Sequence, residues 1–203
     1  MHKFDKEQLL DWMKGIREHP DMVEAFWPSQ INSKLWLKDT IENQLPYHNN
    51  VVIFGAWYGV LADLLNYEKT IVVDIDKDAM LWCSRKYPIH IGRMEDYRYE
   101  TSPEIVINTV TEHLTQEVYD KWYNNIPKGT YFVIQGNNDF GTRDHVRAHK
   151  DLDMFNDANV VQKEHLIMTG EIQYEGPWNV EWNQPTYHKR YMTIGLKDDG
   201  RQD

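Results

Sequence analysis

The stretch VVIFGAWYGVLADLLN, from Val51 to Asn66, decides the fold of this chain. A continuous apolar run, VVIF, is followed by the turn GAWYG and then by an apolar segment of helical spacing. A second apolar run, IVVDID from Ile71, ends in acidic residues. This order predicts a buried strand, a turn, a helix and a second strand, the unit from which parallel α/β sheets are built.

The turn after the first strand has two glycines, Gly55 and Gly59, around two large aromatic residues, Trp57 and Tyr58. Glycine permits positive φ or the close approach of a ligand to the backbone. Asp74 follows the next apolar run directly, roughly 20 residues after Gly55, the separation typical of an acid that binds ribose hydroxyls. We predict a cofactor-binding turn, against the alternative of an ordinary strand-to-helix turn. Trp57 and Tyr58 either pack in the core or form a wall of the cofactor pocket.

Downstream of this unit, predicted strands and helices alternate, which indicates one α/β domain with a mainly parallel sheet. Two late strands, 160–173 and 186–197, flank a turn-rich loop and are expected to form an antiparallel hairpin at the sheet edge. The expected fold is a Rossmann-like, mainly parallel seven-stranded sheet with an antiparallel edge strand and an N-terminal helical cap. The predicted divisions are a cap at 1–48, the α/β domain at 49–197 and a frayed tail at 198–203.

The bulk composition limits the function classes. With 203 residues, 41% of them hydrophobic, the chain suits one well-cored domain. A net charge of −10 without a basic run disfavours nucleic acid as a partner. A single cysteine, Cys83, excludes a disulfide framework, and nine histidines without H-E-x-x-H spacing predict no metal site. No apolar run reaches membrane-spanning length and MHKFDKEQLL is no signal peptide, so we expect a soluble cytoplasmic protein. The oligomeric state is left open.

The order of elements over residues 50–197 resembles the class I S-adenosylmethionine-dependent methyltransferases. In that family a glycine turn after the first strand lets the cofactor approach the backbone, and an acid after the second strand binds the ribose. The resemblance implies S-adenosylmethionine as cofactor and assigns its binding to Gly55, Ala56, Trp57, Tyr58, Gly59, Asp74 and Ile75. A second match is INTVTEHL, residues 107–114, where Asn108 and Thr109 would pass under the methionine end of the cofactor. A third is the turn Pro127-Lys128-Gly129.

Some positions depart from the family pattern. Ile53 stands where an acid usually opens the glycine motif, and Trp57 replaces the middle glycine. Gly92-Arg93 replaces the usual Gly-Asp, so the adenine contact passes to Glu95, Asp96 or the backbone. The motifs Gly-x-Trp-Tyr-Gly, Asn-Thr-x-x-Glu-His and Gln-x-Asn-Asn are similar to small methyltransferase-like proteins of tailed phages. This likeness implies no known substrate, and a phage-encoded enzyme would act in the host cytoplasm.

Polar residues that follow the fourth and fifth strands are candidates for the acceptor side, because ligands bind at the carboxyl edge of open α/β sheets. Substrate contacts are predicted for Glu112, Asn137 and Asn138. The predicted catalytic residues are His113 or His145 as general base, with Asp144 orienting His145 and raising its basicity. The alternatives are a helix N-terminal turn at Glu112, a structural histidine, and simple turn residues at the asparagines.

Gln30, Ser33 and Lys34 share one face of the second N-terminal helix at spacings of three and four residues. This face is either solvated or part of a lid in which Lys34 meets the carboxylate of the cofactor. The predicted reaction is methyl transfer from S-adenosylmethionine to an oxygen or nitrogen of a small or peptidic acceptor, since no Asp/Asn-Pro-Pro-Tyr/Phe signature is present. The alternatives are a non-catalytic protein that kept the fold, or an enzyme that uses S-adenosylmethionine for lysis or alkyl transfer.

Overall fold

The computed structural model describes residues 5–46, 48–159, 165–179 and 184–197, and the predicted tail at 198–203 lies outside these ranges. The helices are α1 (Lys6–Glu18), α2 (Pro28–Gln44), α3 (Val60–Leu65), α4 (Lys77–Cys83), α5 (Gln116–Asn125) and α6 (Leu152–Ala158). Three short 3-10 helices are η1 (Pro20–Phe26), η2 (Met94–Asp96) and η3 (Thr111–His113). The strands are β1 (Asn50–Phe54), β2 (Lys69–Asp74), β3 (Ile89–Ile91), β4 (Ile105–Asn108), β5 (Tyr131–Asn137), β6 (Leu166–Asn179) and β7 (Gln184–Leu196).

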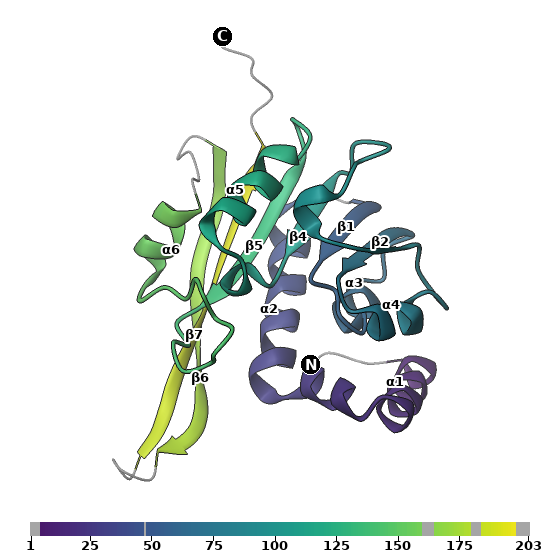
Figure 1. Cartoon of the computed structure of the whole chain (residues 1–203), viewed down its shortest axis with the longest axis horizontal. Helices are drawn as coiled ribbons and strands as arrows, with labels where there is room; N and C mark the ends of the chain where they lie inside the picture. The colour runs from purple at the N-terminus through teal and green to yellow at the C-terminus, as the bar shows by residue number, and fades with distance from the viewer. Residues whose placement is uncertain (1–4, 47, 160–164, 180–183, 198–203) are drawn as a thin grey trace.

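The strands form one seven-stranded sheet in the order β3-β2-β1-β4-β5-β7-β6. Strands β1 to β5 run parallel, and β7 runs antiparallel to both of its neighbours, β5 and β6. The structure confirms the predicted Rossmann-like fold, with the antiparallel strand at the β6 side of the sheet (Figure 1). Parallel strands with helical crossovers place all their carboxyl ends at one edge, where the site is built.

Both faces of the sheet are covered by helices, because successive side chains of a strand point to opposite faces. Val51 and Ile53 of β1 pack in the cluster that includes the buried faces of α2, α3 and α4. Val52 and Phe54 pack in the opposite cluster, with α5 and α6 (Figure 1). Burial on both faces explains why β1 is a continuous apolar run and not an alternating one.

The N-terminal helices pack around the start of α3 and the side of α4. Trp12 of α1 and Met22 of η1 are buried in a third cluster together with Leu64 and Trp82. The Tyr58 hydroxyl lies 2.9 Å from both carboxylate oxygens of Asp21 and ties η1 to the turn after β1. Of the predicted cap at 1–48, η1 therefore lies beside the turn after β1, whereas α2 packs on one face of the sheet.

The β6–β7 hairpin is longer than its sequence predicts. Strand pairing continues through Glu175↔Tyr187 to Asn179↔Gln184, so the loop expected at 175–185 is wrong for residues 175–179 and 184–185. Residues 180–183 of that loop lie outside the described residues. A register shift lies between Glu175 and Trp178, where the sequence has Gly176 and Pro177. Bulges on edge strands accommodate both residue types, so here they interrupt the pairing without ending it. Figure 1 shows the hairpin extending well past the other strands.

Candidate functional site

A cavity of about 800 Å³ opens at the carboxyl edge of β1, β2 and β4. Its walls come from the β1–α3 turn, the tip of β2, the segment after β3, η3, and the start of α2. The volume lies in the range of small-molecule sites, and the position is the one at which open α/β sheets bind ligands.

The β1–α3 turn has three residues in the left-handed region: Gly55 (φ 66°), Trp57 (φ 46°) and Gly59 (φ 74°). Trp57 is a non-glycine residue there, and two hydrogen bonds hold it in place. Its N–H donates to Oδ2 of Asp74 over 2.8 Å, and its carbonyl accepts from the thiol of Cys83 over 3.2 Å. The side chains of Asp74 and Cys83 thus fix the unusual backbone conformation of Trp57.

The side chains of this turn serve both the core and the cavity. Gly55, Ala56, Trp57 and Tyr58 line the cavity, whereas Gly59 supplies the backbone turn that begins α3. The two readings for Trp57 and Tyr58 therefore combine, since both line the cavity and both pack in or against the third cluster.

Asp74 ends β2 and lines the cavity, as its place after the apolar run predicts. Its Oδ2 accepts from the Trp57 N–H and its Oδ1 from the Asp76 N–H over 3.0 Å. A carboxylate offers about four lone-pair sites, so both oxygens can accept further hydrogen bonds. Asp76 instead caps α4 by accepting from two backbone N–H groups, and Ile75 is 72% exposed at the cavity wall.

The two acids predicted near the adenine lie in different environments. Glu95 is buried, lines the cavity and faces Arg93 at 3.4 Å. Asp96 lies outside the residues that line the cavity, and its carboxylate pairs with Lys121 at 2.6 Å. That pairing lowers the pKa of Asp96. Between the two alternatives, the structure places Glu95 at the cavity.

The end of β4 is shaped by Asn108, which is buried and does not line the cavity. Its Oδ1 accepts from the Val110 N–H over 3.0 Å, and its amide nitrogen lies 3.2 Å from the Met94 sulfur. Thr109, the next residue, does line the cavity. Asn108 therefore holds the turn that presents Thr109 and Val110, and its direct contact with the cofactor stays a prediction.

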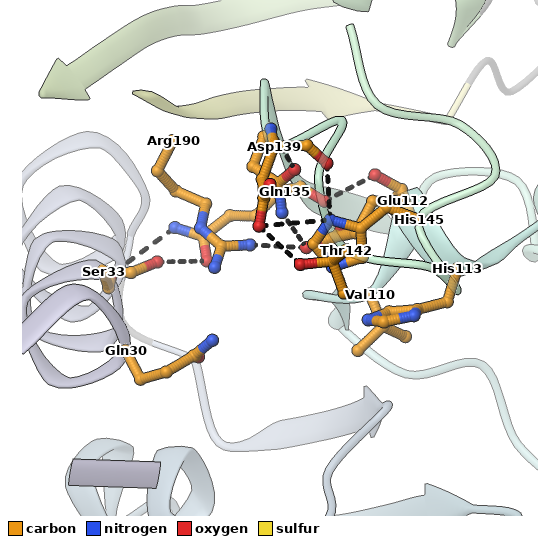
Figure 2. A network of polar contacts seen from close by, with 12 residues as sticks. Gln30, Ser33, Val110, Glu112, His113, Gln135, Asp139, Thr142, His145 and Arg190 are labelled. Atoms are coloured by element: carbon orange, nitrogen blue, oxygen red, sulfur yellow. Dashed lines mark hydrogen bonds and ion pairs between the residues drawn. The ribbon is translucent and has the colours of Figure 1, made fainter. Parts of the chain in front are cut away.

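Glu112 is buried in η3 and reaches the cavity wall. Its Oε1 accepts from Asn137 Nδ2 over 2.6 Å and from Arg190 Nη1 over 2.7 Å. Its Oε2 is buried and has no hydrogen-bond partner among the described residues. Figure 2 shows Arg190 on the α2 side of this carboxylate and the two histidines, His113 and His145, on the other.

The two histidines stand with ring centroids 4.8 Å apart and rings nearly perpendicular. His113 Nδ1 lies 3.0 Å from Asp144 Oδ2, and His145 Nδ1 lies 2.8 Å from the Asp139 carbonyl oxygen. The predicted Asp144–His145 pair was therefore wrong. Neighbouring residues of the turn face different partners, so Asp144 orients His113 instead. Among the described residues that line the cavity are His113 and Asp144 but not His145.

The two asparagines after β5 are not among the residues that line the cavity, and their contact with substrate stays a prediction. Asn137 is buried and uses its amide to hold Glu112. Asn138 accepts from the Lys189 N–H over 2.7 Å and extends the pairing between β5 and β7. Their amides are engaged in closing the sheet end, and Asn137 positions Glu112.

The face of α2 that carries Gln30, Ser33 and Lys34 is turned into the protein. The Ser33 hydroxyl donates to Gln135 Oε1 over 3.0 Å (Figure 2), and Lys34 Nζ donates to Gln30 Oε1 over 3.1 Å. Gln30 and Lys34 line the cavity. Burial, and secondarily the positive charge of Arg190, lower the pKa of Lys34 to about 7. Ser33 is buried and Gln30 and Lys34 are half-buried, so this face is not an open solvated one. The contact of Lys34 with a cofactor carboxylate stays a prediction.

The sequence does not reveal Arg190, the buried partner of Glu112, because it lies in what reads as an ordinary strand. The pairing register between β5 and β7 is the signal that would have indicated Arg190. Antiparallel pairing sets Arg190 opposite Asn137, so the first half of β7 reaches the same edge as the carboxyl end of β5. Arg93, Glu24 and Trp27 are further cavity-lining residues that spacing does not predict.

The sequence matches no protein-family model and no curated protein. Solved structures, however, share this arrangement of strands and helices. The fold is that of the class I methyltransferases. The N-methyltransferase NodS from Bradyrhizobium japonicum, in complex with S-adenosyl-L-homocysteine, is 12% identical with a TM-score of 0.60, over 83% of this chain and 88% of that one. A S-adenosylmethionine-dependent methyltransferase from Clostridium acetobutylicum is 13% identical with a TM-score of 0.58, over 92% of this chain and 99% of that one.

The YcgJ protein from Bacillus subtilis is 14% identical with a TM-score of 0.60, over 83% of this chain and 99% of that one. These likenesses establish the fold, and the activity has to be argued from the residues of the site. Across the described ranges, none of the helices combines the length and the apolar character that a membrane span requires.

Proposed function

We propose that the protein binds S-adenosylmethionine in the cavity and transfers its methyl group to an oxygen or nitrogen of a small-molecule or peptide acceptor. The observation that carries the proposal is the Asp74 carboxylate, which lines the cavity at the tip of β2 and is held beside the glycine turn by the Trp57 N–H. Methyltransferases of the same fold, including one solved with S-adenosyl-L-homocysteine, support it.

The residues around the cavity suit each part of that cofactor. Asp74 keeps lone pairs for two ribose hydroxyls, and Glu95 is a buried acceptor for the adenine amine. Lys34 offers an ammonium group to the cofactor carboxylate from α2. When bound, S-adenosylmethionine supplies an electrophilic methyl group on a sulfonium. The protein then contributes mainly the alignment of the acceptor with that group and the exclusion of water.

The acceptor side is proposed at η3, where His113 lines the cavity. Nδ1 of His113 faces Asp144 Oδ2 at 3.0 Å. In this proposal the ring carries its proton on Nδ1, and Nε2 takes a proton from the acceptor. His145 is a second candidate base, held through Nδ1 by the Asp139 carbonyl. Leu114 and Val118 supply apolar wall.

The class of acceptor follows from the charge of the chain and the size of the cavity. A net charge of −10 makes a polyanionic acceptor such as nucleic acid unfavourable. The similarity of three motifs to small phage methyltransferase-like proteins names no acceptor. We place the activity in the cytoplasm as part of the same proposal.

Calorimetric titration with S-adenosylmethionine and S-adenosyl-L-homocysteine tests the proposal. Wild type should bind both, and Asp74→Ala should weaken binding by about 10- to 100-fold, the loss of two charge-assisted hydrogen bonds. Asp96→Ala is the matched control, because Asp96 lies outside the cavity lining and should leave affinity unchanged. Absence of binding by both ligands would overturn the proposal.

If binding is found, radiolabelled methyl transfer identifies the reaction. The protein is incubated with fractionated cell extract and S-adenosylmethionine carrying label in its methyl group. Label in a small-molecule or peptide fraction supports methyl transfer. Label left in methylthioadenosine, with no labelled acceptor, indicates lysis or alkyl transfer. A second incubation with label in the aminocarboxypropyl chain separates these two, because only alkyl transfer moves that label to an acceptor. Binding without turnover indicates a non-catalytic protein.

A further inference from the structure

We infer that Glu112, His113 and His145 form a binding site for one divalent transition-metal ion at the acceptor end of the cavity. Each of the three offers a ligand atom, and these atoms lie within 4.8 Å of one another. Zinc and similar ions bind carboxylate oxygen and imidazole nitrogen at about 2.0–2.2 Å, which sets neighbouring ligand atoms roughly 3–3.5 Å apart. Small rotations of the imidazole rings would close that difference.

The hydrogen bonds of the two rings leave the correct nitrogen for a metal. A backbone carbonyl can only accept, so Nδ1 of His145 donates to the Asp139 carbonyl. Nδ1 of His113 faces the Asp144 carboxylate, with 3.0 Å between Nδ1 and Oδ2. A neutral ring with its proton on Nδ1 carries a lone pair on Nε2. Metal-binding histidines characteristically direct their other ring nitrogen to a carboxylate or a carbonyl, as both rings do here.

Glu112 supplies the third, independent observation. Its side chain is 2% exposed, and Arg190 and Asn137 both bind Oε1. They hold the carboxylate in place, while Oε2 remains without a hydrogen-bond partner among the described residues. A buried carboxylate oxygen without a donor is unfavourable. A cation at Oε2 would satisfy it.

The ligand set indicates the class of ion. Two imidazole nitrogens and one carboxylate oxygen suit Mn²⁺, Fe²⁺, Co²⁺ or Zn²⁺ better than Mg²⁺ or Ca²⁺, which prefer oxygen ligands. Three protein ligands leave coordination positions open on the side of His113 and Glu112 that faces the cavity. The expectation of no metal site, drawn from the absence of H-E-x-x-H, overlooks this cluster because its members come from two separate segments.

The open positions point to a hydroxyl-bearing acceptor. A substrate oxygen bound to the ion would be held at the methyl-receiving end, with its pKa lowered by the metal charge. The histidines would then act as ligands, and the metal would take the place of an imidazole base. This assignment of the acceptor rests on the proposed function, whereas the ion site itself does not.

Metal binding by tag-free, chelator-treated protein tests the inference directly. The protein is titrated with Mn²⁺, and the free ion is followed by electron paramagnetic resonance in the absence of S-adenosylmethionine. We expect binding of one ion per chain, weakened at least 10-fold in Glu112→Gln, His113→Gln and His145→Gln. His90→Gln, an exposed histidine of β3, is the control and should bind as wild type does.

No saturable binding of Mn²⁺, nor of Co²⁺ or Zn²⁺ in competition with a chromophoric chelator, would overturn the inference. So would binding that the three variants leave unchanged. Circular dichroism checks that the variants fold. If Glu112→Gln does not fold, His145→Gln, which lies on a loop, still tests the site.

Calorimetry with S-adenosylmethionine on the chelator-treated protein separates the two proposals, because binding of the cofactor is then measured without the ion.

Discussion

Arg190 Nη1 donates a hydrogen bond to Glu112 Oε1 over 2.7 Å, and both side chains are almost completely buried. The pair joins β7 to the turn after β4, two elements that are far apart along the chain. Asn137, directly opposite Arg190 in the β5–β7 register, holds the same oxygen. These contacts fix the direction in which Glu112 presents its second oxygen.

The buried pair should show strong coupling in unfolding experiments. Arg190→Gln leaves a buried carboxylate without its counter-charge and should cost about 3–5 kcal/mol in the free energy of unfolding, and Glu112→Gln should also destabilise. The double variant should lose less than the sum of the two, because neither charge is then unpaired. Urea unfolding of the four proteins measures the coupling. Additive losses would show that the pair does not interact in solution.

Gly55 should be intolerant of a side chain even without ligand. A Cβ at this position would lie 2.3 Å from Cγ2 of Val110, and the backbone has φ 66°. Gly55→Ala should therefore cost about 2–5 kcal/mol, the sum of left-handed strain and overpacking. Gly129→Ala is the matched control, since Gly129 has φ 79° but nothing within 4 Å of the added Cβ, and it should cost only about 1–2 kcal/mol.

Adding Val110→Ala to Gly55→Ala separates the two contributions. It removes the two closest contacts, with Cγ2 and Cγ1 of Val110, and leaves the contact of 3.0 Å with Cβ and the backbone strain. The double variant should therefore recover part of the loss in urea unfolding. Equal destabilisation by Gly55→Ala and Gly129→Ala would contradict the packing argument and leave backbone conformation as the sole reason for glycine at position 55.

His149 should make the protein sensitive to mild acid. It is buried against Phe155, and burial, then the positive charge of Arg147, lower its pKa from an ordinary 6.5 to about 4. The unfolded chain therefore takes up this proton first, so the stabilisation is complete above pH 6.5 and is lost as the pH falls towards 4. The loss should be about 1–3 kcal/mol. In His149→Phe, urea unfolding from pH 7 to 4 should show a smaller decline, whereas His90→Phe should decline like wild type.

The positions of the parallel strands along the chain could be predicted from the sequence, because a sheet buried on both faces requires continuous apolar runs such as Val51–Phe54 and Ile105–Ile107. The full length of the hairpin could not. Gly176 and Pro177 are typical turn residues, and only pairing with β7 shows that an edge strand passes through them with a register shift.

At the site, the sequence reveals what is local. Gly55 and Asp74 could be predicted because the turn and the strand tip are one continuous unit. The partners of Glu112, His113 and His145 could not, because they depend on how β7 and the segment after β5 fold back over η3. Residue spacing along the chain carries no information on that return, which is why Asp144 was paired with the wrong histidine.

Lys34 should couple cofactor binding to proton uptake. Its pKa of about 7 means that the ammonium is only partly protonated at pH 8 in the free protein. A cofactor carboxylate beside it would favour the charged form and raise that pKa. Affinity for S-adenosylmethionine should therefore be greatest below pH 7 and fall as the pH rises from 7 towards 9. Calorimetry at pH 8 in buffers of different ionisation enthalpy should detect uptake of up to one proton per cofactor bound.

Lys34→Met removes the titrating group, so it should abolish the proton uptake and weaken binding by about 10-fold, the loss of one charge-assisted pair. It should also stabilise the free protein. Below pH 7 the buried Lys34 ammonium destabilises the folded protein in full, and this cost falls as the pH rises from 7 to 10.5. Methionine carries no charge and has no such cost. Lys38 lies one turn further along α2 and pairs with Glu42. Lys38→Met should change neither the proton uptake nor the affinity for the cofactor. Proton uptake that persists in Lys34→Met would assign the coupled group to another residue and remove Lys34 from the cofactor site.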